Sequence, residues 1–232
     1  ISITNTPKDR EEIARAFIAK SVYNFQTTRD LIDRLHHDRT LRIIYGWRYK
    51  SDIPSESKFS RVFKELSDLQ IAAKTHEQFV KEYLSNTVFM YNAIDATKIP
   101  LRVKPVKVEK EENPKNKVGR PKKSEVKEPK QPTILQQQQT MTTTKEMLSL
   151  VSTHCGVGIK QNSKGNREVW IGGKLHISAV DGDIPVAAFY SGANVHDSSV
   201  ALPLINETSK RVNYLYDLQD AGYDSNIIRD FS

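Results

Sequence analysis

The chain has 232 residues, of which 38% are hydrophobic, and a net charge of +7. This length allows one large domain or two ordinary ones, and the hydrophobic content is low for a single compact core, so part of the chain is expected to be unstructured. Apolar runs such as residues 184–190 fall far below the ~20 residues that a membrane span requires. Cys155 is the only cysteine, which excludes a disulfide framework and favours a reducing, cytoplasmic setting.

The positive charge is concentrated in the middle of the chain. Residues 101–131 carry 11 Lys and Arg against 5 Asp and Glu, whereas the balance is 16 against 13 before this segment and 8 against 10 after it. A basic surplus in one strip favours an anionic polymer as partner, because neutralised phosphates release counterions. Nucleic acid is the first hypothesis, and an ordinary solvated charge run is the alternative.

Residues 8–86 are predicted to be helical, because apolar residues recur at helical spacing in several short blocks. Thr27 or Thr28 is expected to N-cap the second block. Thr75, with Gln78 three residues later, predicts a capping box for the last block. These short helices are expected to bury one another as a small bundle.

Residues 88–99 are rich in β-branched and aromatic side chains and are predicted to form a buried strand. Prolines then interrupt a Lys/Glu-rich tract that is followed by Gln and Thr runs, so residues 101–145 are expected to be a disordered or extended insert. The elements expected after it are two strands joined by a turn, a helix, a strand and a helix, at residues 168–180, 184–191, 197–209, 212–218 and from 225 onward. This order is typical of a ribonuclease H-like α/β (α+β) core.

Two aspartates lie at the ends of predicted strands. Asp95 ends an otherwise apolar run, and Asp220 follows the strand at residues 212–218. An unpaired carboxylate is costly to bury, so each either caps a strand at the surface or holds a metal ion, which prefers hard oxygen ligands. Asp217 and Asp224 are rivals of Asp220, and Asp224, which precedes Ser225, is expected to N-cap the last helix.

Other polar residues near these strands have competing interpretations. Asp197, between His196 and Ser198, is expected to N-cap a helix rather than to form a catalytic pair with the histidine. Lys174 and His176 alternate with apolar residues on one strand, so they share a face and point either at a DNA backbone or at water.

The predicted insert contains Lys117-Val-Gly-Arg-Pro-Lys-Lys123, which resembles an AT-hook core. In such a core an extended Gly-Arg-Pro enters a narrow minor groove, with Arg120 inside it and Lys117, Lys122 and Lys123 near phosphates. A plain phosphate-binding or localisation patch is the alternative.

Two parts of the chain resemble bacterial insertion-sequence DDE transposases. The N-terminal part, with Thr27-Thr-Arg-Asp-Leu-Ile-Asp-Arg-Leu35, Gly46-Trp47 and residues 51–61, is similar to the helical domain that precedes their core. The segments similar to the core itself are Tyr91-Asn-Ala-Ile-Asp-Ala-Thr97, Trp170-Ile-Gly-Gly-Lys-Leu-His176, Ser191-Gly-Ala-Asn-Val-His-Asp-Ser198 and Asp220-Ala-Gly-Tyr-Asp224.

The resemblance implies roles for individual residues. Asp95 and Asp220 take the places of the first two catalytic aspartates, which hold two Mg²⁺ (or Mn²⁺) ions for DNA strand cleavage and transfer. The family's third ligand is a glutamate on a later helix, past Ser232, so the chain is expected to be a fragment, cut at both ends and inactive as it stands. The implied partners are double-stranded DNA, as terminal inverted repeats and target, and a second copy of the intact protein, in the bacterial cytoplasm with the nucleoid.

The expected organisation has four parts: a helical DNA-binding domain at residues 1–86, the first core strand at 87–100, the basic insert at 101–145 and the incomplete remainder of the core at 146–232. Two alternatives to the transposase are a catalytically dead DNA-binding remnant and a nuclease of the same fold that hydrolyses without joining.

Overall fold

The computed structural model of the chain describes residues 8–106, 131–161 and 164–232. The chain forms two compact units, Ile1–His76 and Glu77–Ser232. The boundary between them falls within one helix, α5 (Ile71–Leu84).

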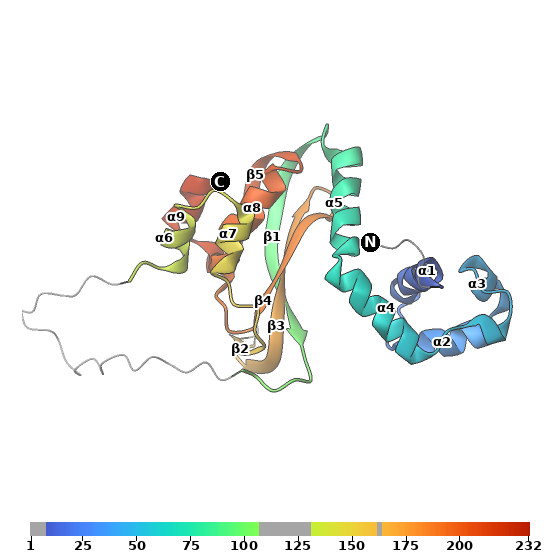
Figure 1. The fold of residues 1–232 in the computed structure, drawn as a ribbon. Helices are drawn as coiled ribbons and strands as arrows, with labels where there is room; N and C mark the ends of the chain where they lie inside the picture. The colour runs from blue at the N-terminus through green and yellow to red at the C-terminus, as the bar shows by residue number, and fades with distance from the viewer. Residues whose placement is uncertain (1–7, 107–130, 162–163) are drawn as a thin grey trace, which may run out of the picture. The chain divides into compact units, whose positions relative to one another are not determined.

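The first unit is built from helices (Figure 1). They are α1 (Arg10–Val22), α2 (Thr28–His37), α3 (Arg39–Ile44), the short 3₁₀ helix η1 (Lys50–Asp52), α4 (Glu56–Asp68) and the first half of α5. Their buried core contains Ile13 of α1, Leu31 and Leu35 of α2, and Phe59 of α4. Trp47, which follows α3, packs its ring against Phe59 with 5.9 Å between the ring centroids. Each helix is too short to be stable alone, so this shared core stabilises all of them.

Local capping explains where α2 begins. Thr27 caps α2 as expected: its hydroxyl accepts from the Asp30 amide at 3.1 Å, and the Asp30 carboxylate accepts from the Thr27 amide at 2.9 Å. The capping box predicted at Thr75 is wrong, because Thr75 lies inside α5. The chain instead turns between α4 and α5 at Gln70, whose φ is 52°.

The second unit contains a five-stranded mixed sheet among its described residues. Its strands are β1 (Val88–Pro100), β2 (Gly156–Gln161), β3 (Arg167–Val180), β4 (Ile184–Gly192) and β5 (Asn213–Gln219). β3 pairs antiparallel with β1, β2 and β4, whereas β5 pairs parallel with β1. A helical first unit and a mixed sheet with helices in the second confirm the α+β part of the fold prediction.

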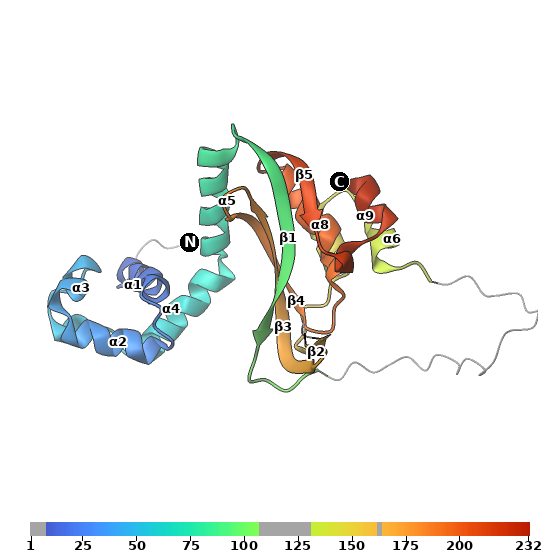
Figure 2. The same ribbon diagram turned by 180° about the vertical axis from the view of Figure 1, so that it is seen from behind.

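Helices cover both faces of the sheet. Figures 1 and 2 show the second half of α5 on one side and α8 (Ala201–Ser209), α7 (Thr144–Ser149) and α9 (Asn226–Phe231) on the other. On the α8 side, Leu202 and Leu204 are fully buried in a cluster with Ile94 of β1 and Met147 of α7. In a smaller buried cluster, Val80 of α5 packs with Phe89 of β1 and Val180 of β3.

A buried polar chain crosses from β3 to β1, α8 and β5. The Ser178 hydroxyl donates to Asn92 Oδ1 at 2.6 Å and lies 2.6 Å from the Thr208 hydroxyl of α8. The Asn92 amide then donates to Asp217 Oδ1 of β5 at 2.7 Å. Ser178, Asn92 and Thr208 are fully buried, so these bonds must form together, because an unpaired buried polar group is costly.

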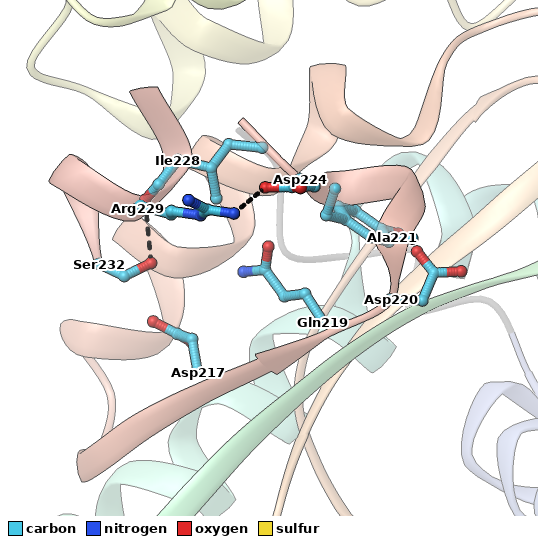
Figure 3. A pocket seen from close by; sticks show the side chains of 9 residues that line it. Asp217, Gln219, Asp220, Ala221, Asp224, Ile228, Arg229 and Ser232 are labelled. Atoms are coloured by element: carbon cyan, nitrogen blue, oxygen red, sulfur yellow. Dashed lines mark hydrogen bonds and ion pairs between the residues drawn. The ribbon is translucent and has the colours of Figure 1, made fainter. Parts of the chain in front are cut away.

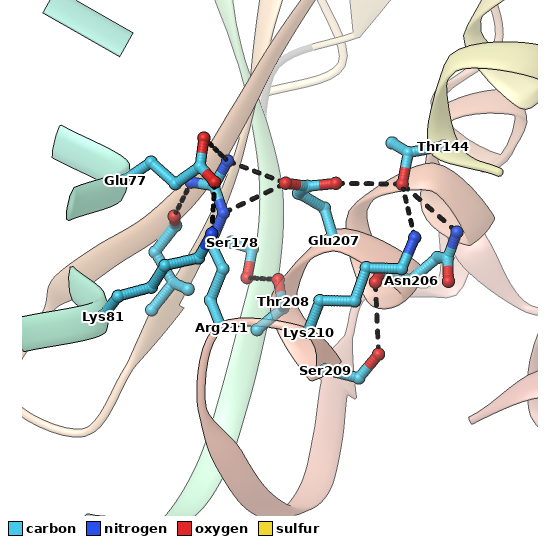
Figure 4. A network of polar contacts seen from close by, with 11 residues as sticks. Glu77, Lys81, Thr144, Ser178, Asn206, Glu207, Thr208, Ser209, Lys210 and Arg211 are labelled. Atoms are coloured by element: carbon cyan, nitrogen blue, oxygen red, sulfur yellow. Dashed lines mark hydrogen bonds and ion pairs between the residues drawn. The ribbon is translucent and has the colours of Figure 1, made fainter. Parts of the chain in front are cut away.

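A second polar network ties the end of α8 to its surroundings (Figure 4). The Arg211 guanidinium donates to Glu207 at 2.8 Å and to the Val186 carbonyl of β4 at 2.7 Å. The Thr144 hydroxyl of α7 donates to the other Glu207 oxygen at 2.9 Å. Glu207 therefore links α7, α8 and, through Arg211, the sheet.

The strands predicted from the sequence are present as β1, β3, β4 and β5, but β2 was not predicted. The predicted insert needs a correction, because residues 134–138 and 144–149 are the helices α6 (Ile134–Gln138) and α7. Thr133 and Thr143 each begin one of them with a capping box. Gln138 is fully buried and donates to the carbonyls of Met147 and Ser199, so this polar tract is anchored by hydrogen bonds as well as by the apolar contacts of Leu135 and Met147 with the core.

Gly172 lies so close to the neighbouring strand that it leaves no room for a side chain. It has a φ of 151°, and a Cβ there would lie 2.0 Å from the Ile99 carbonyl oxygen of β1. We expect Gly172→Ala to lower the free energy of unfolding by about 2 to 4 kcal/mol, from backbone strain and overpacking together. In the control Gly165→Ala, φ is 80° but the nearest atom is 3.8 Å away, so only about 1 to 2 kcal/mol is expected. Urea titrations followed by circular dichroism measure both, and equal decreases would contradict the steric argument.

Candidate functional site

The parallel pairing of β1 with β5 brings two distant aspartates to neighbouring positions. The last paired residues of the two strands are Ile94 and Gln219, and Asp95 and Asp220 are the next residues on each strand. Because neighbouring strands lie about 4.8 Å apart, the backbones of the two aspartates leave this pairing side by side. β1 continues beyond Asp95 with β3 as its partner, whereas β5 ends and the chain enters the 3₁₀ helix η3 (Ala221–Tyr223).

Both carboxylates are exposed and keep free acceptor capacity. One Asp95 oxygen accepts from the Ala96 amide at 2.6 Å, and one Asp220 oxygen accepts from the Gly222 amide at 2.8 Å. Neither aspartate forms an ion pair with a described Lys or Arg. Each backbone amide orients its carboxylate without neutralising it, which leaves two negative charges facing solvent.

A buried tyrosine hydroxyl lies within electrostatic range of this pair. Tyr223, in η3, is 2% exposed, and its hydroxyl has no hydrogen-bond partner in the described structure. Burial raises the pKa of Tyr223, and the carboxylates of Asp197, Asp95 and Asp220 raise it further. The hydroxyl therefore stays protonated as a potential donor. Sequence reasoning did not single out Tyr223, although its place in the Gly-Tyr-Asp segment was a signal.

Lys174 and Asp197 form an ion pair near the carboxylates. The Lys174 ammonium donates to Asp197 at 2.7 Å and to the Val195 carbonyl at 2.8 Å, and the Lys174 side chain is only 15% exposed. Asp197 was expected to N-cap a helix. It is instead the first residue of the 3₁₀ helix η2 (Asp197–Val200), and its carboxylate pairs with the Lys174 ammonium. Two of the three ammonium donors are thus used within the protein, and a DNA contact by Lys174 stays a prediction.

His176 faces the protein interior rather than DNA or water. It is fully buried, its Nε2 lies 2.8 Å from the Ser191 hydroxyl, and its Nδ1 has no partner among the described residues. Burial lowers the pKa of His176 to about 4; nearby Lys174 lowers it too, while Asp197 and Asp95 oppose the shift. The ring is therefore neutral at pH 7 and cannot offset the charge of the aspartates.

The two rival aspartates are engaged elsewhere. Asp217 accepts from Asn92, and burial raises its pKa, so it serves the internal polar chain. Asp224 is not the cap of α9, since Ser225 holds that position and Asp224 pairs with Arg229. A cavity of about 470 Å³ lies beside the end of β5 and is lined by Asp217, Asp220 and Asp224 among others, and Figure 3 shows these side chains around it.

The donor set can be tested against the metal that the resemblance implies. No group of three or more His, Cys, Asp or Glu side chains arranged to hold a metal ion is found in residues 8–106, 131–161 and 164–232. Mg²⁺, however, is commonly held by one or two carboxylates together with waters and substrate phosphates. Two exposed aspartates without cationic partners fit that mode, so Asp95 and Asp220 suit a divalent ion that completes its coordination with other oxygen ligands.

The remaining sequence-based DNA contacts are not located. Lys117, Arg120, Lys122 and Lys123 of the AT-hook-like motif lie outside the described residues. Their role stays a prediction from the sequence.

Comparison with known proteins identifies one region. Residues 4–65 match the family model described as Transposase domain (DUF772). No curated protein and no solved structure matches the chain. Among the described residues, no helix is both long and apolar enough to cross a membrane. The helical first unit is thus similar to a transposase domain, and the sheet unit is characterised by its geometry alone.

The buried neutral His176 makes a testable contribution to acid stability. Its folded pKa of about 4 lies below its ordinary value of 6.5, so the unfolded chain takes up the proton first. The free energy of unfolding therefore falls by up to about 3 kcal/mol as the pH drops from 6.5 to about 4. Above pH 6.5 the histidine is neutral in both states and causes no pH dependence. We expect His176→Gln to flatten the fall in unfolding free energy between pH 7 and pH 4.5. The exposed control His154→Gln should keep the wild-type slope, and an unchanged slope in His176→Gln would contradict the argument.

Proposed function

We propose that this chain is part of a DDE transposase whose sheet unit is a ribonuclease H-like core. The match of residues 4–65 to a transposase domain supports the family. The observation that carries the proposal is the β1/β5 pairing, which brings Asp95 and Asp220 together from opposite ends of the sheet unit.

The sheet order supports the proposed core. Three strands, β1, β3 and β4, form an antiparallel set in which β3 lies between the other two, and β5 joins β1 in parallel on the free side. The segment between β4 and β5 is mainly α8, which packs on one face of the sheet. The chain order of β1, β3, β4, α8, β5 and α9 agrees with the order of elements expected for a ribonuclease H-like core, and the unpredicted β2 adds to it by pairing with the first half of β3.

The proposed reaction is phosphoryl transfer on DNA, and residues of this chain would hold and orient its components. When bound, divalent ions activate the attacking oxygen and stabilise the leaving oxygen. Asp95 and Asp220 would hold these ions from two adjacent strands, each oriented by a backbone amide. His176 is buried and neutral and Lys174 is paired with Asp197, so neither of them forms an ion pair with the two carboxylates. The pair therefore retains the charge that attracts the metal.

The proposed partner is duplex DNA, in keeping with the transposase match. The helical first unit would bind transposon ends, with the basic segment at residues 101–131 adding sequence-independent phosphate contacts. Strand transfer joins two ends, so the intact protein would act as a homodimer. Mg²⁺ or Mn²⁺ would be the cofactor.

One observation favours a second candidate, a DNA-binding protein without cleavage activity. The structure groups no third acidic ligand with Asp95 and Asp220 in the part of the chain that it describes. A protein of this kind would bind DNA in the same way whether or not a divalent ion is present, so metal binding separates the two candidates.

The first test is metal binding in the absence of DNA. We expect the chain to bind Mn²⁺, and we expect Asp95→Asn or Asp220→Asn to weaken that binding at least about tenfold, because each removes an anionic oxygen ligand. Electron paramagnetic resonance of free Mn²⁺ during a titration measures this. Asp224→Asn is the matched control, since Asp224 lines the same cavity but pairs with Arg229; it should bind like the wild type.

A result in which both variants bind Mn²⁺ as tightly as the wild type would refute the metal site. Nicking of supercoiled DNA gives a second readout. Any Mn²⁺-dependent nicking by the wild type should vanish in the double variant Asp95→Asn/Asp220→Asn, and nicking that survives there belongs to another site.

A further inference from the structure

A second charged feature lies in the helical unit, on α3 and the turn that follows it. Residues 39–51 contain four basic residues and no Asp or Glu. They are Arg39, Arg42, Arg48 and Lys50. All four line one cavity of about 670 Å³, together with Gly46 and Trp47.

The walls of this cavity are held by the core of the unit. Arg42 is 6% exposed, and its guanidinium donates to the carbonyls of Leu35 and His36 at the end of α2, at 2.9 and 3.3 Å. Trp47 is 2% exposed and packs on Phe59. Arg42 Nε and Trp47 Nε1 are both buried donors without an acceptor in the described structure. The core of the unit therefore holds in place two of the residues that line the cavity, and each of them carries a buried donor without an acceptor.

The cations at the rim are not neutralised by the protein. Arg39, Arg48 and Lys50 are exposed, and none of them forms an ion pair within the described ranges of the chain. Several other exposed cations of the unit do pair, among them Arg15 with Glu11, Arg29 with Glu56 and Lys64 with Asp68. A local excess of unpaired positive charge thus coincides with the cavity.

The carboxylates of residues that adjoin this segment either cap backbone amides or do not line the cavity. Asp38 accepts from the Leu41 amide and pairs with Arg34, and Asp52 accepts from the Tyr49 amide at 2.8 Å. Glu12 of α1 lies next to Gly46 but does not line the cavity. The backbone turns away from α3 at Gly46, whose φ of 109° suits glycine, and this turn lets the cations of residues 48 and 50 line the same cavity as Arg39.

We propose that this cavity and the cations at its rim bind neighbouring backbone phosphates of duplex DNA. This inference rests on the proposed function, which selects DNA among the possible polyanions. The cavity would be the contact through which the helical unit binds DNA. Arginine matches phosphate geometry with its planar fork of donors, and a duplex presents closely spaced phosphates to which the several rim cations can bind at once. The contact carries no sequence information, so it positions the duplex rather than selecting a site.

The test is salt-dependent binding of a labelled mixed-sequence duplex, measured by fluorescence anisotropy in EDTA. We expect Arg39→Ala/Arg48→Ala/Lys50→Ala to lower the slope of log K against log salt by about two to three, at about 0.9 for each phosphate that is no longer neutralised. Affinity should fall about tenfold or more, because charge-assisted hydrogen bonds are removed. The matched control Arg15→Ala/Arg29→Ala/Arg61→Ala removes the same charge from exposed positions of the same unit and should lower the slope by less than about one.

Equal decreases in the two triple variants would overturn the proposal, because net charge alone would then explain binding. The charge-retaining variant Arg39→Lys/Arg48→Lys should bind more tightly than Arg39→Ala/Arg48→Ala, and circular dichroism reports whether each variant is folded. Competition by polyglutamate as strong as by unlabelled duplex would also overturn it, since the site would be a general polyanion site. EDTA keeps the outcome independent of Asp95 and Asp220: weaker Mn²⁺ binding in their variants tests the proposed catalysis, and the anisotropy tests only this cavity.

Discussion

The second unit depends on the parallel pairing of β1 with β5. The two strands come from opposite ends of that unit, and the buried hydrogen bond between Asn92 and Asp217, which are 125 residues apart, ties them in one register. A slip by one residue would turn the side chains of β5 to the opposite faces and would leave the Asn92 amide, which is fully buried, without its acceptor. This polar contact therefore specifies where Asp95 and Asp220 leave the sheet, because a buried amide tolerates only the register that satisfies it.

Charge is distributed in two contrasting ways in the two units. In the sheet unit the nearby basic groups are either paired, as Lys174 is with Asp197, or neutral, as His176 is through burial, so Asp95 and Asp220 keep their negative charge. In the helical unit the cations around Trp47 keep their positive charge because the adjacent carboxylates cap helices instead. The carboxylates of Asp95 and Asp220 repel a DNA phosphate unless a divalent ion lies between them and the phosphate. The cationic cavity attracts a phosphate directly. The proposed roles in catalysis and in binding follow from this difference.

Much of the fold could be predicted from local patterns, and the exceptions have physical causes. β1, β3, β4 and β5 are rich in β-branched and aromatic residues, so their presence was predictable. β2 (Gly156–Gln161) is short and contains two glycines, and it forms because β3 offers a partner. α6 and α7 lie in a polar tract whose composition indicated disorder; Thr caps and the buried Gln138 stabilise them, the latter through a bond distant in sequence. For the same reason the sequence did not reveal the ion pair between Lys174 and Asp197, which joins residues 23 positions apart.

The amino-acid sequence by itself determined which residues could carry charge at strand ends, where a helix begins after Thr27, and where the basic residues accumulate. These properties depend on side-chain chemistry and on hydrogen bonds within a few residues. Only the tertiary structure decided that Asp95 and Asp220 leave adjacent strands, that His176 is neutral, and that the cations of residues 39–50 surround one cavity. Those properties depend on burial and on contacts between segments far apart in the chain, which no local pattern encodes.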